Sequence, residues 1–139
     1  MANPVEGKGR SVSLPIKTSE DVVTVRQRVR AVAIEEGLKL VDQTKIITAA
    51  SELARNTLTY GNGGTVLIEA VANGSRRGVR LTFEDRGPGI ADIELAMKDG
   101  YTTGGGLGLG LSGAKRLSNE FEIHSKPGEG TRVTITRWR

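Results

Sequence analysis

The sequence predicts a two-layer α/β sandwich of the α+β kind, in which a mixed, mainly antiparallel sheet carries helices on one face. Two observations predict this fold. Strand-like segments come in pairs joined by glycine-rich turns, and segments with helical spacing fall between the pairs. A length of 139 residues supports one domain with one modest core. We therefore expect a single domain over residues 10–139, preceded by a flexible N-terminal segment over residues 1–9.

Composition excludes several classes of protein. The chain has no cysteine and one histidine, which excludes disulfides, thiolate metal sites and His-rich metal sites. No apolar run is long enough to span a bilayer, and the N-terminus lacks the apolar core of a signal peptide, so we expect a cytoplasmic protein without membrane contact. The net charge of +4 permits a nucleic-acid binder, but the basic residues are scattered and aromatic residues are few. Nucleic acid is therefore not an expected partner.

The first elements follow from local patterns. Apolar and polar residues alternate over 10–16, which predicts a strand, and Pro15 places that strand at a sheet edge. Thr18 followed by Asp21 predicts a helix N-cap with an acidic first turn. Apolar residues then recur at helical spacing until Gly37 ends the helix: Val22, Val25, Val29 and Ala33. Arg26 lies on this helix, and its ordinary interpretation is a solvated side chain.

A second helix is expected from Asp42, as N-cap, through residues 43–60. Its buried stripe comprises Ile46, Ala50, Leu53, Ala54 and Thr57. Glu52 and Asn56 are four residues apart, so they project from one helix face, at the border of that stripe. The simplest interpretation is an exposed Glu–Asn pair. The pair becomes a candidate site only if the rest of the fold holds a ligand against it.

The remaining elements are two hairpins and two short helices. Strands are expected over 65–72 and 78–85, joined by a turn at Asn73-Gly74, so Asp85 falls at a strand end. Short helices follow over 93–98 and about 109–117. The last two strands, 120–125 and 131–138, are joined by the turn sequence K-P-G-E-G. His124 lies on the first of them, and no partner for catalysis is evident.

The chain is organised around a glycine-rich stretch, residues 84–113. It contains nine glycines, seven of them in two clusters, E-D-R-G-P-G-I and T-T-G-G-G-L-G-L-G. Glycine serves where the backbone needs a positive φ or must approach a ligand closely. Asp85 can accept hydrogen bonds from a base amine, and N–H groups of the second cluster, at a helix start, can cradle phosphates. The stretch predicts a nucleotide pocket with a lid.

Other interpretations of the glycines fit less well. A Walker A loop needs Gly-Lys-Ser/Thr at its end, whereas Gly113 is followed by Ala114 and then Lys115. The dinucleotide fingerprint needs a strand immediately before Gly108, and D-G-Y-T-T-G-G-G is not one. A merely flexible loop remains as the alternative without function, but a long ordered run of glycine has a large entropy cost.

Four segments together resemble the GHKL superfamily, which includes Hsp90, gyrase, MutL and histidine kinases. D-R-G-P-G-I is similar to its first glycine box, G-G-G-L-G-L to its second, S-E-L-A-R-N to its N-box and G-E-G-T to its third conserved box. The resemblance covers the chain from Val12 to Trp138 and implies the Bergerat ATP-binding fold, with ATP and Mg²⁺ as cofactors.

The resemblance also implies a role for individual residues. Glu52 would be the catalytic base, Asn56 would coordinate Mg²⁺, and Asp85 would bind the adenine amine. Arg26 matches, less closely, a family arginine near the transferred phosphate. The further nucleotide contacts implied are Gly87, Gly89, Ile90, Thr103, Gly104, Gly105, Gly106, Leu107, Gly108, Leu109 and Thr131.

Within the superfamily the motifs resemble the RsbT-type switch serine/threonine kinases of bacterial stress signalling. The resemblance implies phosphorylation of serine or threonine on STAS-domain proteins, followed by release and activation of a partner phosphatase. One alternative is an anti-sigma factor that binds a sigma factor and phosphorylates its antagonist. Another is a non-catalytic, ATP-gated binding module. The sequence leaves open whether the chain forms a homodimer.

Overall fold

The computed structural model describes residues 10–98 and 110–139, so the predicted flexible segment 1–9 and most of the predicted lid lie outside the described residues. The strands are β1 (Ser11–Ile16), β2 (Gly64–Asn73), β3 (Arg76–Asp85), β4 (Glu120–Lys126) and β5 (Gly130–Trp138). The helices are α1 (Ser19–Glu35), α2 (Leu40–Thr59), α3 (Ile93–Ala96) and α4 (Gly110–Arg116).

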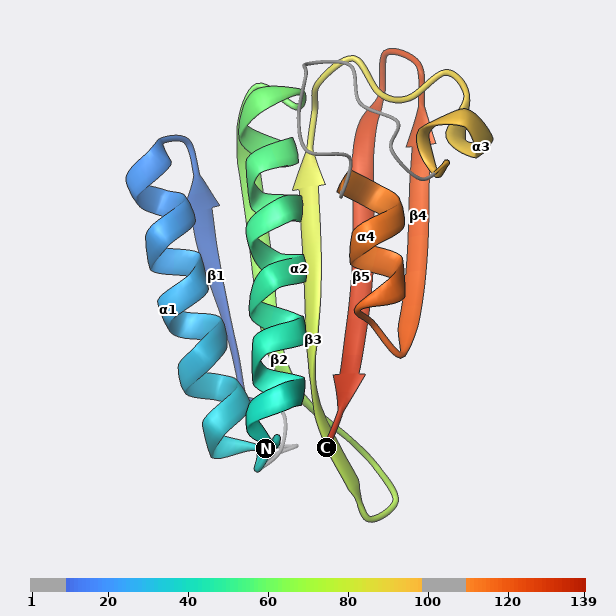
Figure 1. The fold of residues 1–139 in the computed structure, drawn as a ribbon. Helices are drawn as coiled ribbons and strands as arrows, with labels where there is room; N and C mark the ends of the chain where they lie inside the picture. The colour runs from blue at the N-terminus through green and yellow to red at the C-terminus, as the bar shows by residue number, and fades with distance from the viewer. Residues whose placement is uncertain (1–9, 99–109) are drawn as a thin grey trace.

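The strands form one sheet in the order β1-β2-β3-β5-β4. All four pairings are antiparallel, so the mainly antiparallel sheet is confirmed, and the described strands include no parallel pair that would make it mixed. β1 is an edge strand, as Pro15 predicts, because a proline cannot donate to a second neighbour. The two hairpins, β2–β3 and β4–β5, pair with each other through β3 and β5. Because β3 and β5 are antiparallel, the C-terminal end of β3 lies beside the start of β5 (Figure 1).

The helices α1, α2 and α4 cover one face of the sheet, which gives the predicted two layers (Figure 1). The core lies between these layers, where the predicted stripe of α1 and that of α2 are buried. The sheet contributes alternate residues of its central strands, among them Val79, Leu81 and Phe83. Within the described residues, no helix is both long and apolar enough to cross a membrane.

The start of α1 is fixed by the predicted capping box. The Thr18 hydroxyl accepts a hydrogen bond from the Asp21 amide at 3.2 Å, and the Asp21 carboxylate accepts one from the Thr18 amide at 3.1 Å. Two otherwise unpaired donors of the first turn are satisfied in this way. At the other end, Gly37 adopts φ +81°, a conformation that favours glycine and reverses the chain toward α2.

The predicted N-cap of α2 is wrong. The helix begins at Leu40, with Lys39 as an N-cap that makes no side-chain hydrogen bond. Asp42 lies inside the first turn, where its charge still favours the positive end of the helix dipole. Its carboxylate is bound instead by Arg137 of β5, through Nε at 3.1 Å and Nη2 at 2.7 Å. Asp42 thus forms a tertiary ion pair instead of the predicted N-cap, and a pattern of neighbouring residues cannot predict such a pair.

Replacing Arg137 by Gln is expected to destabilise the fold by roughly 2 kcal/mol, because it removes charge-assisted bonds to a carboxylate that stays mostly buried. The two side chains are only 14% and 19% exposed, and Arg137 Nη1 also donates to the Leu117 carbonyl at 3.4 Å. Urea unfolding measures the loss. The exposed pair of Arg80 and Glu69 supplies the control, since Arg80→Gln should change stability by less than about 0.5 kcal/mol. Equal effects of the two variants would contradict this account.

Candidate active site

The site is built around Asp85, which ends β3. Its Cα partner across the β3–β5 ladder is Thr131, and the partner of Thr131 across β4–β5 is Ser125. Side chains alternate across a strand, so Asp85 lies on the same face as buried Phe83, the face that carries the helices. Three polar side chains therefore meet at one end of the sheet, beneath the helix layer. Asp85 and Thr131, both predicted as nucleotide contacts, are brought together.

The Asp85 carboxylate is held by backbone. Its Oδ1 accepts a hydrogen bond from the Gly87 amide at 2.9 Å. Gly61, directly after the C-cap of α2, lies so close that a Cβ there would collide with this carboxylate. Gly87 in turn lies against the Gly61 backbone. The absence of side chains at both glycines lets the end of α2 approach Asp85, which fixes the carboxylate and leaves its Oδ2 without a partner among the described residues.

The first glycine box is fastened to the β4–β5 hairpin. The Gly128 amide donates to the Pro88 carbonyl at 2.7 Å, and the Ile90 amide donates to the Ser125 hydroxyl at 2.8 Å. Gly89 has φ +77°, and a Cβ there would collide with the Lys126 carbonyl. Glycine is thus required at this position twice, for conformation and for close approach. The box forms a rigid wall beside Asp85 rather than a free loop.

Ser125 is a site residue that the sequence analysis missed. Its hydroxyl accepts from the Ile90 amide, lies 2.8 Å from the Thr131 hydroxyl, and lies 3.0 Å from the Gly130 carbonyl to which it can donate. One hydroxyl thereby links the first glycine box, β4 and β5. The signal was present in the turn K-P-G-E-G, because pairing Lys126 with Gly130 places Ser125 opposite Thr131. Gly61 was missed as well, since its contact with Asp85 forms only in the folded chain.

Replacing Ser125 by Ala is expected to raise the KM for ATP about 5- to 10-fold with little change in kcat, since one lost hydrogen bond is worth about 1 kcal/mol. The substitution leaves the Ile90 amide and the Thr131 hydroxyl without their shared partner. Steady-state kinetics measure both constants. Ser118→Ala is the matched control, because it also removes a part-buried hydroxyl, one that bonds the Ala114 carbonyl away from this site. A fall in kcat at unchanged KM would contradict the assignment.

Glu52 and Asn56 lie on one face of α2, as predicted, and both are partly exposed. The Asn56 carboxamide makes no hydrogen bond within the described residues, although its backbone carbonyl accepts from the Tyr60 and Gly61 amides. The Glu52 Oε2 pairs with Arg55 Nη1 at 3.1 Å. A carboxylate and a free carboxamide therefore face solvent beside the core, one helical turn apart.

The helix sets the order of these groups. Gly61, at the end of α2, touches Asp85. At 1.5 Å per residue, Asn56 lies about 7 Å back along the axis and Glu52 about 13 Å back. A ligand anchored at Asp85 and extended along α2 therefore passes Asn56 before it reaches Glu52. Arg26 is exposed on α1 and makes no ion pair or hydrogen bond with a described residue. It lies about two turns from the N-terminal end of α1, and Glu52 lies about two turns from the C-terminal end of α2, the helix ends nearest the site.

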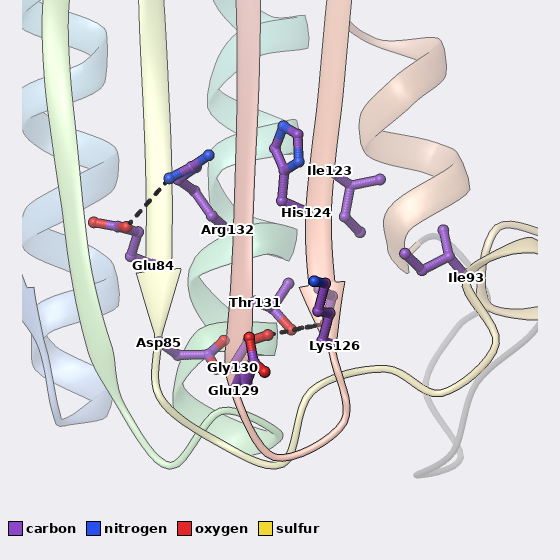
Figure 2. Close-up of a pocket in the computed structure, with 11 residues that line it drawn as sticks. Glu84, Asp85, Ile93, Ile123, His124, Lys126, Glu129, Gly130, Thr131 and Arg132 are labelled. Carbon is purple, nitrogen blue, oxygen red and sulfur yellow. Dashed lines mark hydrogen bonds and ion pairs between the residues drawn. The ribbon is translucent and has the colours of Figure 1, made fainter.

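A cavity of about 440 Å³ opens at this end of the sheet. Figure 2 shows Asp85, Gly130 and Thr131 at the strand ends, with Ile93 of α3 to one side. Glu84, His124 and Arg132 also line it, but strand alternation places them on the face away from the helices. The cavity therefore includes Asp85, Ser125 and Thr131 of the candidate site, whereas Glu52 and Asn56 of α2 do not line it. His124 is exposed.

The residues fit a nucleotide with its metal. A carboxylate whose second oxygen has no partner among the described residues suits a base amine. The Asn56 carboxamide, likewise without a partner in the described ranges, is an oxygen ligand of the kind that Mg²⁺ takes alongside phosphates and water. No group of three or more His, Cys, Asp or Glu side chains that could hold a metal alone occurs in the described ranges. The predicted phosphate-binding lid, Thr103, Gly104, Gly105, Gly106, Leu107, Gly108 and Leu109, lies outside the described residues.

The fold and this site define an ATP-binding domain. The family model described as histidine kinase-, DNA gyrase B-, and HSP90-like ATPase matches residues 41–138. The chain belongs to this family, and the predicted GHKL resemblance is confirmed.

Individual relatives narrow the class. Serine/threonine-protein kinase RsbT of Bacillus subtilis (strain 168) is 49% identical over 123 residues, which are 88% of this chain and 92% of that protein. Anti-sigma F factor of Thermoanaerobacter sp. (strain X514) is 30% identical over 88% of this chain and 89% of that protein. The chain is therefore similar, over most of its length, to a protein kinase and to anti-sigma factors.

Solved structures agree with this grouping. The crystal structure of the RsbU and RsbW domains of Rv1364c from Mycobacterium tuberculosis superposes with a TM-score of 0.64 at 25% identity, over 94% of this chain and 33% of that longer one. The histidine kinase domain of a blue-light activated histidine kinase from Erythrobacter litoralis superposes with a TM-score of 0.52 at 19% identity, over 84% of this chain and 59% of that one, and shows the shared fold alone.

Proposed function

We propose that this ATP-dependent serine/threonine protein kinase phosphorylates a serine or threonine of a small STAS-domain protein within a bacterial partner-switching pathway. The kinase class follows from 49% identity to a serine/threonine-protein kinase across nearly the whole chain. The observation that supports the chemistry is the order Asp85, Asn56, Glu52, because it matches the order of base, phosphates and transferred group in ATP.

Each residue has a role in this proposal. Asp85 accepts a hydrogen bond from the adenine amine, and Thr131 supports the same end of the base. Asn56 would hold Mg²⁺, which when bound neutralises charge on the phosphates. Glu52 accepts the proton of the substrate hydroxyl, as the catalytic-base carboxylate does in protein kinases. Arg26, exposed and without a partner among the described residues, is available to stabilise the transferred phosphoryl group.

The lid residues complete the proposed site. Backbone N–H groups of residues 104–109, which lead into α4, would bind the phosphates and exclude water. Release of the kinase after phosphorylation of its STAS partner, and subsequent activation of a phosphatase, belong to the same proposal. The two measurements below test the class of partner.

Phosphate transfer from γ-labelled ATP tests the proposal. The purified chain is mixed with Mg²⁺ and a STAS-domain protein encoded nearby, with a substrate whose acceptor serine or threonine is replaced by alanine as the control. Label on the intact substrate alone supports the proposal, and chelation of Mg²⁺ should abolish it. ATP binding without transfer to any STAS protein would contradict it and favour an ATP-gated binding module.

A second candidate is an anti-sigma factor, which the 30% identity to anti-sigma F factors over 88% of the chain favours. In that case the chain would bind a sigma factor, and it would also phosphorylate the antagonist protein that opposes this binding. Titration of the chain with purified sigma factors in the presence of ATP separates the two. Tight binding favours the second candidate, and its absence alongside STAS phosphorylation favours the first.

A further inference from the structure

The Glu52 side chain has one partner in the described part of the chain, and that partner is Arg55. Arg55 Nη1 lies 3.1 Å from Glu52 Oε2, three residues further along α2. The Glu52 side chain is 23% exposed and the Arg55 side chain 55% exposed. Arg55 has no role in the proposed function.

This pair is a poor candidate for a stabilising contact. It is a single-contact, partly exposed ion pair within one helix, a type worth roughly 0.3–0.5 kcal/mol. Arg55 is not needed to bury apolar area either, since it lies on the solvent side of α2. Any importance of the contact must therefore lie outside fold stability, and its geometry indicates an effect on the orientation of the Glu52 carboxylate.

The contact occupies one carboxylate oxygen and orients the other. With Oε2 bound to Arg55, the Glu52 side chain loses rotational freedom, and Oε1 remains without a partner among the described residues. A catalytic base must lie within hydrogen-bond reach of the proton that it accepts, and a misplacement of about 1 Å can lower a rate by about 100-fold. Holding a flexible three-torsion side chain in one orientation is thus worth more to the rate than to the fold.

We propose that Arg55 is a positioning residue, which aims Oε1 of Glu52 at the substrate hydroxyl. This inference rests on the proposed function. In the step it serves, the substrate oxygen forms a bond to the γ-phosphorus of ATP, the bond from that phosphorus to the β–γ bridging oxygen breaks, and ADP leaves. The hydroxyl proton moves to Glu52 Oε1. Arg55 keeps its own proton throughout and touches neither ATP nor the acceptor.

The test compares three variants with the wild-type chain. Arg55→Gln removes the charge, and Arg55→Lys restores a cation that can make the same single nitrogen–oxygen contact. Arg80→Gln is the control: Arg80 and Glu69 also lie 3.1 Å apart, with a second contact at 3.4 Å and side-chain exposures of 44% and 25%, but on the sheet face away from the helices. The readouts are kcat and KM for transfer to a STAS-domain protein, the Kd for ATP by calorimetry, and the thermal midpoint.

Arg55→Gln is expected to lower kcat about 10- to 100-fold while the Kd for ATP changes by less than about twofold. Arg55→Lys should recover most of the loss, and Arg80→Gln should behave as wild type. Thermal midpoints should agree among all three, as expected for exposed pairs.

Three outcomes would overturn the inference, and each is distinct from failure of the proposed function. An unchanged kcat in Arg55→Gln would leave the pair without a role in transfer. A raised kcat would make Arg55 an inhibitory latch on the base, and a raised KM for the protein substrate at unchanged kcat would make it a docking contact. Failure of the proposed function would show instead in the wild-type chain, as ATP binding without transfer, and the inference would fail with it.

Discussion

Replacing Asp85 by Asn is expected to abolish measurable ATP binding, with a loss of affinity of about 100-fold or more. The carboxylate uses Oδ1 to accept from the Gly87 amide at 2.9 Å, which leaves Oδ2 for the adenine amine. In the variant, an amide oxygen that keeps the Gly87 contact turns its NH₂ toward the base, so that two donors face each other. Losing a charge-assisted hydrogen bond and leaving donors unpaired costs roughly 3 kcal/mol, which corresponds to more than a 100-fold change.

Calorimetric titration with ATP measures this effect, and Glu84→Gln is its control. Glu84 precedes Asp85 in β3 but lies on the opposite sheet face, where it pairs weakly with Arg132 at 4.0 Å. The control should bind ATP as the wild-type chain does. If Asp85→Asn kept wild-type affinity, the pocket assigned to adenine would be wrong, and the family's ATP site would have to lie elsewhere in this chain.

Replacing Glu52 by Gln is expected to lower phosphate transfer about 100- to 10,000-fold, the usual contribution of a general base. The substitution keeps the shape of the side chain and an oxygen that can still accept from Arg55, but removes the group that takes the substrate proton. ATP affinity should change little, because Asp85 and Asn56, not Glu52, bind the nucleotide in the proposed site. The two variants therefore separate binding from chemistry.

Single-turnover transfer from γ-labelled ATP measures this loss. Glu69→Gln, the partner of Arg80 in the equivalent exposed pair, controls for the loss of one surface carboxylate. Transfer at the wild-type rate in Glu52→Gln would refute its role as base. Intact regulation of the partner in this variant would show that regulation depends on ATP binding rather than on phosphate transfer.

Most elements were predicted to within about two residues because their signals are local. The capping box of Thr18 and Asp21, the stripe from Val22 to Ala33 and the strand end at Asp85 depend on neighbours in sequence, and all three are confirmed. The helix after the first glycine box is shorter than expected, Ile93–Ala96, with Asp92 as its N-cap. Asp42 was placed wrongly because its partner, Arg137, lies 95 residues away.

The residues of the candidate site also fall into two groups, those predicted from the sequence and those identified only in the structure. Asp85, Asn56 and Glu52 were predicted from motifs, since a carboxylate at a strand end and an i, i+4 pair on a helix are features of local sequence, and their roles stay predictions. Ser125 and Gly61 were missed: the hairpin turn places Ser125 opposite Thr131, but no motif marks what either residue contacts in the folded chain. Ser125 acquires its role only when β4 and β5 pair beside the first glycine box, and Gly61 only when the end of α2 approaches Asp85.

The sequence by itself predicted the class of fold and the family, both of which are confirmed, and it named Asp85, Asn56 and Glu52 as the residues proposed to meet the nucleotide and the transferred phosphate. The tertiary structure decided how those residues are held: the Gly87 amide on Asp85, the Ser125 hydroxyl between two strands and a loop, and the Arg55 contact that leaves one oxygen of Glu52 free. The physical reason is range. Periodicity, caps and turns act over a few residues, whereas a hydrogen-bonded site depends on which distant segments the packed core brings within about 3 Å of each other.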